Sequence, residues 1–372
     1  MADLFIATLT PTLGTGAAMR TYTLLRALVS LGPVDVLYLR FDAPRPAPEI
    51  VAIDGLTLHE VASSRGVRRV ATYARALAAG VPRGVARGVS PELADAALRM
   101  CGDGSQRGRV IADGPVAAAT VAGLARRRPV IYNAHNLESA RIPSLGEGRP
   151  RRYARWERRL LGTMGESWMV SRADLDGAAE LAPGARLRYV PNAVDVESIA
   201  PVRPPARSHR GLFVADHTYA PNREALAFLI DQVMPLVWAA LPDATLAVTG
   251  RGLELPSGTD TRIEALGFVD DLAAVYATAA AAVIPLLRGG GSPLKFIEAL
   301  AYGVPVVATP TAAAGLDAQD GVHYVEADGA PALAAALTRV LRDGADTIAA
   351  AGRELARSDY SVAALARRIA AS

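Results

Sequence analysis

Residues 289–309 read GGGSPLKFIEALAYGVPVVAT. The glycines follow an apolar run at 281–285, and the spacing of the apolar residues predicts a helix over 293–301 and a strand over 304–308. A strand, a glycine-rich loop, a helix and a second strand in this order are typical of a βαβ unit in a parallel sheet. The stretch therefore favours an α/β fold.

The same alternation of strand-sized apolar runs and helix-sized segments continues through the rest of the chain. Further strands are predicted at 4–8, 34–39, 110–112, 130–133, 167–170, 187–190, 211–215, 244–249, 263–266 and 323–325. Further helices are predicted at 17–30, 114–125, 151–161, 172–181, 222–240, 271–279, 331–341, 347–357 and 362–371. The repetition predicts Rossmann-like architecture, in which ligands bind outside the carboxyl ends of the strands.

The length and one break in the pattern indicate two domains. A chain of 372 residues exceeds the size at which a single hydrophobic core usually stops growing. The alternation is interrupted at 199–210, where Pro201, Pro204 and Pro205 lie close together. We therefore predict one Rossmann-like domain over residues 1–200 and a second that begins at residue 201, with a cleft between them.

The basic residues bear on the choice of partner, and one of them stands out. Forty basic and 37 acidic residues give a formal net charge of +3, which does not indicate a nucleic-acid partner. Lys295 is the only lysine in the chain. A lone lysine among so many arginines suggests a position where a compact point charge is needed.

The cysteine count and the hydropathy of the chain indicate where in the cell the protein is expected. Cys101 is the only cysteine, which excludes an internal disulfide and a multi-cysteine metal site. No apolar run reaches the ~18 residues that a spanning helix needs, and residues 1–10 lack the charged start of a signal peptide. We expect a cytoplasmic protein with neither a signal peptide nor a membrane helix.

The glycine-rich loop and the helix after it predict an anion site. Lys295 and Glu298 are three residues apart and share one face of the predicted helix. Amides of the loop and of the helix start can bind phosphate oxygens together with the lysine, and the carboxylate can accept ribose hydroxyls. We therefore predict binding by Gly290, Gly291, Ser292, Leu294 and Glu298. A solvated Lys–Glu pair on a surface helix remains the alternative.

A second glycine-rich turn follows the first predicted strand. Gly14, Thr15 and Gly16 come directly before a helix, where backbone amides can meet an anion. The turn lacks the third glycine of the dinucleotide fingerprint, and no well-placed acidic residue follows, which disfavours a nicotinamide cofactor. Phosphate contact and a tight structural turn both stay open for these residues.

The stretch 289–309 resembles the signature of the retaining glycosyltransferases of family 4, which have the GT-B fold. Supporting motifs occur in the expected order along nearly the whole chain: the Gly14–Thr15–Gly16 turn with Arg20, HNLE at 135–138, PNAVD at 191–195, PN at 221–222, TGRG at 249–252 and GFVDD at 267–271. The resemblance implies an acceptor-binding domain over 1–200, a nucleotide-sugar-binding domain over 201–357, and a C-terminal helix over 358–372 that crosses back to the first domain.

The resemblance also implies roles for single residues around the donor. Glu298 is similar to the second carboxylate of the family's paired-Glu motif, which binds the donor ribose, whereas Gly290 stands where the first Glu would be. The loop with Phe268 and Val269 is similar to the loop that contacts the nucleobase. The family's Arg and Lys phosphate clamp has no clear match. The candidates to replace it are Arg223, Arg251, Arg288 and, as first choice, Lys295.

Two residues in the first half are predicted to act with Lys295 in catalysis. His135 follows a predicted strand within the HNLE motif, and Glu138 is a candidate to orient it or to act as an acceptor. Asp113 stands near the place where many family members have a histidine that contacts the donor sugar. A purely structural histidine remains the alternative reading for His135.

Two arginine clusters, at 65–75 and 149–159, lie in the predicted acceptor domain. A basic helix can dock on anionic lipid, so peripheral contact at the inner face of the membrane stays open. The alternative is that the arginines form ordinary solvated helix faces.

Together these features predict a glycosyltransferase that moves a sugar from a nucleoside-diphosphate sugar to the hydroxyl of a small-molecule, glycan or lipid-linked acceptor. Retention of the anomeric configuration, and a place in polysaccharide, glycolipid or glycosylated natural-product synthesis, are implied by the resemblance alone. We expect no metal and no cofactor beyond the donor. A nucleotide-sugar 2-epimerase and a subunit that has lost catalysis are the alternatives.

Overall fold

The computed structural model describes residues 1–40, 45–63, 67–102, 107–144, 150–205, 208–289 and 292–371. The chain forms two compact units. The first contains Met1–Pro191 together with Leu365–Ser372, and the second contains Asn192–Ala364. From the sequence we placed the boundary after residue 200 and the return to the first domain at residue 358.

The first unit is built on a seven-stranded parallel sheet with the order β3-β2-β1-β4-β5-β6-β7. Its strands are β1 (Asp3–Ala7), β2 (Val34–Arg40), β3 (Leu56–Ala62), β4 (Val110–Asp113), β5 (Ile131–Asn133), β6 (Glu166–Met169) and β7 (Leu187–Tyr189). Every residue of β1 is buried, as expected for a central strand covered on both faces.

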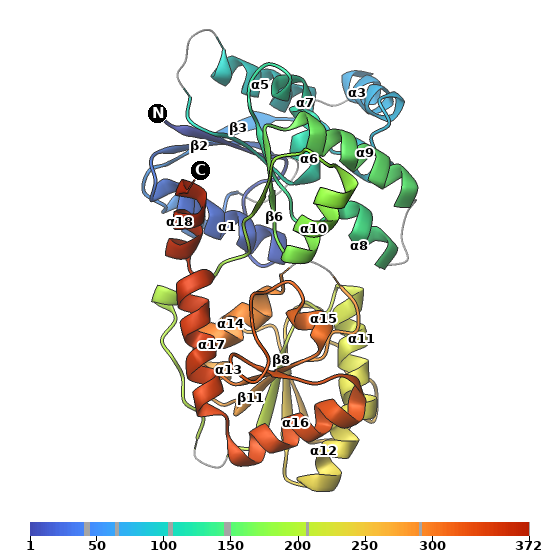
Figure 1. The fold of residues 1–372 in the computed structure, drawn as a ribbon, viewed down its shortest axis with the longest axis vertical. Helices are drawn as coiled ribbons and strands as arrows, with labels where there is room; N and C mark the ends of the chain where they lie inside the picture. Colours follow the sequence, from blue (N-terminus) through green and yellow to red (C-terminus); the bar gives the residue numbers. More distant parts are fainter. Residues whose placement is uncertain are drawn as a thin grey trace. The chain divides into compact units, whose positions relative to one another are not determined.

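The helices of the first unit connect these strands (Figure 1). They are α1 (Gly16–Val29), α2 (Pro48–Val51), α3 (Val67–Ala78), α4 (Arg83–Ala86), α5 (Pro91–Cys101), α6 (Gly114–Thr120), α7 (Ala122–Ala125), α8 (Glu138–Ser144), α9 (Pro150–Thr163) and α10 (Arg172–Leu181). The last helix of the chain, α18 (Val362–Ala370), contributes its residues from Leu365 onward to this unit.

The second unit is built on a six-stranded parallel sheet with the order β10-β9-β8-β11-β12-β13. Its strands are β8 (Arg210–Val214), β9 (Thr245–Thr249), β10 (Ile263–Gly267), β11 (Ala281–Ile284), β12 (Val306–Ala308) and β13 (Val325–Glu326). In both sheets the strand order reverses beside the first strand, between β1 and β4 and between β8 and β11. These reversals are the switch points where doubly wound sheets bind ligands.

Helices cover both faces of the second sheet. Figure 1 shows α11 and α12 on one side of it and α13, α14 and α17 on the other. The helical segments are η1 (Val196–Ser198), α11 (Ala220–Phe228), η2 (Leu229–Val233), α12 (Met234–Ala240), α13 (Leu272–Tyr276), α14 (Leu294–Tyr302), α15 (Pro310–Ala313), α16 (Gly329–Asp343) and α17 (Asp346–Asp359). The predicted α/β fold with two Rossmann-like domains is confirmed.

One predicted helix differs from expectation. The sequence predicted a continuous helix over 222–240, but the structure has a π-helical turn at Leu229–Val233 between α11 and α12. Pro235 follows this turn and lacks the N–H that would bond the carbonyl four residues earlier. The wider π turn accommodates the proline within one helical rod.

Candidate functional site

The switch point of the second sheet brings the starts of two helices together. Helix α11 follows β8, and α14 follows the neighbouring strand β11. Neither helix has a side-chain hydrogen bond at its N-cap, so neither start is closed by a capping side chain. First-turn amides and the helix dipole favour an anion at such a place.

Lys295 lies in the first turn of α14 and reaches α11. Its Nζ donates to Asn222 Oδ1 at 2.6 Å and lies 5.2 Å from the centroid of the Phe213 ring. It makes no ion pair with a carboxylate in the part of the chain that the structure describes. Burial lowers the pKa of Lys295 to about 7, although the charges of Glu298 and Asp216 act in the opposite direction. The amine therefore lies where an additional negative charge would stabilise its protonated form.

Glu298 lies one turn further along the same helix. Burial raises the pKa of its carboxyl group, and the charge of Lys295 partly offsets this effect. No protein donor among the described residues forms a hydrogen bond with this carboxylate. Its oxygens are thus available to accept hydroxyl hydrogen bonds from a ligand.

Ser292 and Leu294 lie where the chain enters α14, and Gly290 and Gly291 lie outside the described residues. The Ser292 side chain is buried, and its Oγ has no hydrogen-bond partner among the described residues. Asn192 Nδ2 donates to the Ser292 carbonyl oxygen at 2.6 Å and holds the residue in place. A buried hydroxyl without a partner beside a helix start suggests that a ligand completes its hydrogen bonding.

The three arginines considered for the phosphate clamp differ from Lys295. Arg223 donates to the carbonyl oxygens of His217 and Thr218, and Arg288 binds Glu224 through two hydrogen bonds. Arg251 has an exposed side chain, and its carbonyl accepts a hydrogen bond from the amide of His217. Of the four candidates, Lys295 is the one that lies at the start of α14 with a neutral amide as its hydrogen-bond partner.

The loop after β10 carries the two residues predicted to lie near the nucleobase. Phe268 is 64% exposed, and Val269 is half-buried. The Gly267 carbonyl before them accepts hydrogen bonds from the Gly250 amide and the Thr249 hydroxyl. The loop is therefore fixed to the end of β9 and presents an aromatic face to solvent.

Sequence reasoning missed His217 in the loop after β8. Its ring is buried, Nε2 donates to the Thr249 carbonyl at 3.3 Å, and Nδ1 has no hydrogen-bond partner among the described residues. Burial lowers the pKa of His217, and the charge of Lys295 adds to this effect. The sequence signal that could have identified His217 is its position in the loop after a predicted strand, shortly before Pro221–Asn222.

The switch point of the first sheet holds a buried polar network centred on Asp113. This carboxylate ends β4 and accepts from Thr21 Oγ1 at 2.6 Å, Asn133 Nδ2 at 2.7 Å and His135 Nε2 at 2.8 Å. Burial alone would raise the pKa of Asp113, but the His135 charge and the three hydrogen bonds lower it overall. With three donors already bound, Asp113 is suited to orient His135 rather than to bind a substrate itself.

Arg20, noted in the sequence beside the glycine turn, joins this network. Its guanidinium is buried in α1 and donates to Asn133 Oδ1 at 2.6 Å. Burial lowers the pKa of Arg20 to about 10, against the opposing charges of Asp113 and Asp174, so the group stays protonated near neutral pH. The buried Arg20 charge therefore offsets the negative charges of Asp113 and Asp174.

His135 keeps part of its ring accessible at the surface of the first unit. Its side chain is 22% exposed, and it lies against Gly114, which has a positive φ of 79°. A Cβ on Gly114 would come within 3.2 Å of His135 Cε1, so glycine leaves room for the ring. The loop continues into α8, where two first-turn amides, those of Glu138 and Ser139, donate to the Glu157 carboxylate.

The predicted glycine turn lies at the start of α1, at the carboxyl end of β1. Gly14 has a positive φ of 96°, and the Thr15 hydroxyl accepts from the Ala18 amide as the N-cap. Gly14, Thr15 and Gly16 are all exposed. The turn thus presents its backbone to solvent on the same edge of the sheet as His135.

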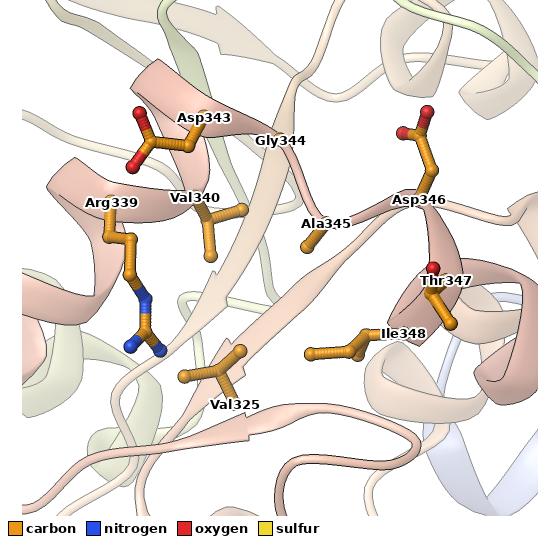
Figure 2. A pocket seen from close by; sticks show the side chains of 9 residues that line it. All are labelled: Val325, Arg339, Val340, Asp343, Gly344, Ala345, Asp346, Thr347 and Ile348. Atoms are coloured by element: carbon orange, nitrogen blue, oxygen red, sulfur yellow. The ribbon is translucent and has the colours of Figure 1, made fainter.

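Two hollows in the second unit lie outside the predicted donor residues. One, of about 570 Å³, is lined by β13, the end of α16 and the start of α17, and Figure 2 shows Arg339, Asp343 and Asp346 around it. Its position at the first residue of β13 places it at the amino edge of the sheet. The other, of about 200 Å³, lies beside α11 and includes His217 and Arg223.

No group of three or more histidine, cysteine or acidic side chains in the described ranges is placed to hold a metal ion. None of the described helices has both the length and the apolar character needed to cross a bilayer.

Sequence comparison gives a family assignment for part of the chain. Residues 208–343 match the family model described as glycosyl transferases group 1. Phosphatidyl-myo-inositol mannosyltransferase of Mycobacterium leprae (strain TN) is 30% identical over 225 residues, which are 56% of this chain and 58% of the relative. The match thus spans little more than half the length of that relative.

Comparison with solved structures covers the whole chain. Anabaena HepE, solved in complex with UDP and glucose, superposes with a TM-score of 0.70 at 14% identity, over 100% of this chain and 99% of HepE. The sucrose-phosphate synthase of Thermosynechococcus elongatus gives a TM-score of 0.73 at 15% identity, over 100% and 98%. Similarity at these identities establishes the fold. The chain has the GT-B fold, and within it residues 208–343 match the group 1 glycosyltransferase model.

Proposed function

We propose that this chain is a retaining glycosyltransferase that moves a sugar from a nucleoside-diphosphate sugar to an acceptor hydroxyl, in polysaccharide, glycolipid or glycosylated natural-product synthesis. The observation that carries the proposal is the placement of Lys295, Ser292 and Glu298 around the start of α14, at the switch point of the second sheet. Two similar proteins, a phosphatidyl-myo-inositol mannosyltransferase and HepE solved with UDP and glucose, support the same donor class.

The second unit would stabilise the leaving diphosphate. Negative charge develops on the phosphates as the sugar departs, and fixed donors aimed at that charge lower the barrier. Lys295 supplies a positive charge, the Ser292 hydroxyl supplies a donor, and the open start of α14 supplies amides and the helix dipole. Glu298 would accept the ribose hydroxyls, while Phe268 and Val269 would lie near the base, with Arg251 in the adjacent loop.

Because the positive charge comes from the protein, we propose that turnover needs no metal ion. The leaving phosphate can itself take the acceptor proton, so no strong protein base is required. Activity in the presence of excess EDTA should equal the activity without it. Loss of turnover that Mg²⁺ or Mn²⁺ restores would contradict this part of the proposal.

The first unit would receive the acceptor and the sugar. We propose that His135 contacts a hydroxyl of one of them and that Asp113 fixes the ring through its Nε2 hydrogen bond. Gly14, Thr15 and Gly16 would contribute backbone groups at the same edge of the first sheet.

A screen of nucleoside diphosphates and their sugars by thermal shift tests the donor class, because a ligand that binds the native state raises its apparent stability. We expect one base to raise the Tm, and the sugar it carries to be transferred when acceptors are added. Isomerisation of the donor without an acceptor would favour the 2-epimerase alternative. Nucleotide binding without turnover over a broad acceptor panel would favour a subunit that has lost catalysis.

Glu298→Gln should weaken nucleotide binding by about 10-fold, because two charge-assisted hydrogen bonds become neutral ones. Titration calorimetry with the nucleoside diphosphate measures this. Glu354→Gln on α17, an exposed glutamate in the same unit, is the matched control and should bind as the parent does. Equal affinity of the Glu298 variant and the parent would remove Glu298 from the ribose site.

Asp113→Asn should lower kcat by about 10-fold or more, since it removes the charge that orients His135 while keeping the shape of the side chain. The nucleoside-diphosphate Kd should stay unchanged, because the donor residues belong to the second unit. Asp176→Asn, an exposed carboxylate on α10, is the control. A parental kcat in Asp113→Asn would leave His135 with a structural role only.

We also propose peripheral contact of the first unit with anionic lipid at the inner face of the membrane. Helix α3 contains no buried residue and presents Val67 and Val70, 86% and 66% exposed, together with Arg68 and Arg75. Co-sedimentation with phosphatidylglycerol vesicles should exceed that with phosphatidylcholine vesicles and should fall with salt. Equal binding to both would leave these arginines as solvated helix faces.

A further inference from the structure

The connection between β11 and α14 is fixed to α11 by an ion pair that the proposed chemistry does not use. Arg288 Nε donates to Glu224 Oε2 at 2.6 Å, and its NH2 group donates to the other carboxylate oxygen. Glu224 belongs to α11, and Arg288 lies four residues after the end of β11. The planar guanidinium therefore meets both carboxylate oxygens in the fork geometry that gives such pairs a defined orientation.

The described residues on either side of the pair are also held by hydrogen bonds. The Leu286 carbonyl before it accepts from the Thr309 hydroxyl at 2.6 Å, and the Ser292 carbonyl after it accepts from Asn192 at 2.6 Å. Arg288 lies between these two points. The ion pair thus ties the chain to α11 at a point between Leu286 and Ser292.

The same two helices meet a second time through Lys295 and Asn222. Asn222 lies two residues before Glu224 on α11, so one short stretch of α11 binds both the lysine and the arginine. The two cations differ in their partners. The Glu224 carboxylate neutralises Arg288, and the hydrogen bonds from Arg288, helped by its charge, lower the pKa of Glu224. Lys295 donates to a neutral amide instead.

We propose that Arg288 is a positioning residue for the donor site: with Glu224 it fixes the β11–α14 connection so that Ser292 and Lys295 meet the diphosphate, and it does not itself bind phosphate. This inference rests on the proposed function. The pair is partly exposed, with 34% of the Arg288 and 42% of the Glu224 side chain accessible, so it adds little to the stability of the fold. Its effect should appear in ligand binding.

The test measures the Kd of UDP and of GDP, in separate titrations, for Arg288→Gln, Glu224→Gln, the double variant and the charge reversal Arg288→Glu/Glu224→Arg. Both single variants should weaken binding of the preferred nucleotide by about 3- to 10-fold, and the double variant no further, because both singles break one interaction. The reversal should recover most of the loss. In turnover assays KM should rise more than kcat falls.

A direct phosphate contact by Arg288 predicts a different pattern. Glu224→Gln would then free the guanidinium and leave binding equal or tighter, Arg288→Gln alone would weaken it, and the reversal would fail to rescue. That pattern would overturn the proposal. The exposed Arg357–Glu354 pair on α17 provides matched controls, Arg357→Gln and Glu354→Gln, which should change nothing.

The outcomes also separate this inference from the function on which it rests. If the parent protein binds neither UDP nor GDP and no other donor raises its Tm, the proposed function fails and the positioning role fails with it. If the parent binds and all four Arg288 and Glu224 variants bind equally well, only the positioning role is overturned. Unfolding transitions of the variants without ligand should match that of the parent.

Discussion

Replacing Lys295 by methionine is expected to lower kcat/KM for the donor by about 100-fold or more, without lowering the stability of the fold. Loss of one preorganised donor to developing negative charge typically has an effect of this size. Methionine fills similar space, and the variant no longer places an amine among protein atoms. Steady-state kinetics and thermal unfolding of the same preparation check both halves of the expectation.

The effect of Lys295 on the stability of the fold depends on pH in a defined direction. Because burial lowers the folded-state pKa of Lys295 to about 7, below its ordinary value of 10.5, the unfolded chain binds more protons between these values. The Lys295 contribution to stability therefore rises with pH between about 7 and 10.5 and is least favourable below pH 7. In Lys295→Met this pH dependence of stability should be absent. The variant should exceed the parent in stability most at or below pH 7.

Donor binding should follow the opposite trend. The amine of the free protein loses its charge as pH rises through about 7, so the affinity of the parent for the donor should fall above that value. Lys295→Arg keeps its charge at every accessible pH and should lose this dependence, yet turn over more than about 10-fold slower, because a planar fork replaces a compact charge. Unchanged kinetics in both the Met and the Arg variants would exclude Lys295 from the donor site.

Gly250→Ala should destabilise the second unit by about 3 kcal/mol or more, the largest stability effect we expect. Gly250 has a φ of 133°, and a Cβ there would lie 1.7 Å from the Ala215 carbonyl oxygen. The two backbones approach closely because Gly250 follows β9 and Ala215 follows β8, its neighbour in the sheet. The loops that follow β8 and β9 would have to move apart.

Gly258→Ala is the control for that prediction. Gly258 also has a positive φ, 81°, but a Cβ there would meet nothing within 4 Å. Gly258→Ala should therefore lower the free energy of unfolding only because alanine disfavours a positive φ, by about 1 kcal/mol. Thermal unfolding should show a drop of about 10 °C for Gly250→Ala against a few degrees for Gly258→Ala, since 1 kcal/mol shifts the Tm of a domain of this size by about 2 to 4 °C. Equal shifts would mean that the backbone at Gly250 relaxes freely.

Much of the fold was predictable because buried parallel strands are continuous apolar runs. The predicted strands at 4–8 and 34–39 correspond to β1 and β2 within a residue or two. The edge strand β3 was missed, because Leu56–Ala62 alternates apolar and polar residues and stays half-exposed. Helix α3 was missed as well, although Val67, Val70 and Leu77 recur at helical spacing, and in the structure this apolar stripe buries no residue.

The candidate site was predictable where its residues are neighbours in the chain. Lys295 and Glu298 share a helix face, so their spacing alone placed them together. The contacts of these residues depend on strand order, which a single sequence does not reveal. Asn222 reaches Lys295 across 73 residues of chain, and Arg20 reaches Asn133 across 113. The roles that we propose for Arg288 and Asp113 likewise depend on partners far away in the chain.

Because the chain has a single lysine, amine-directed reagents can probe the proposed donor site selectively. Reductive methylation with ¹³C-formaldehyde would label Lys295 and the terminal amine, giving one side-chain dimethylamine signal by NMR. The chemical shift of that signal against pH would report the charge of the amine directly. Acylating reagents would likewise modify one ε-amine, and the degree of protection by a nucleotide would measure occupancy without any knowledge of the acceptor.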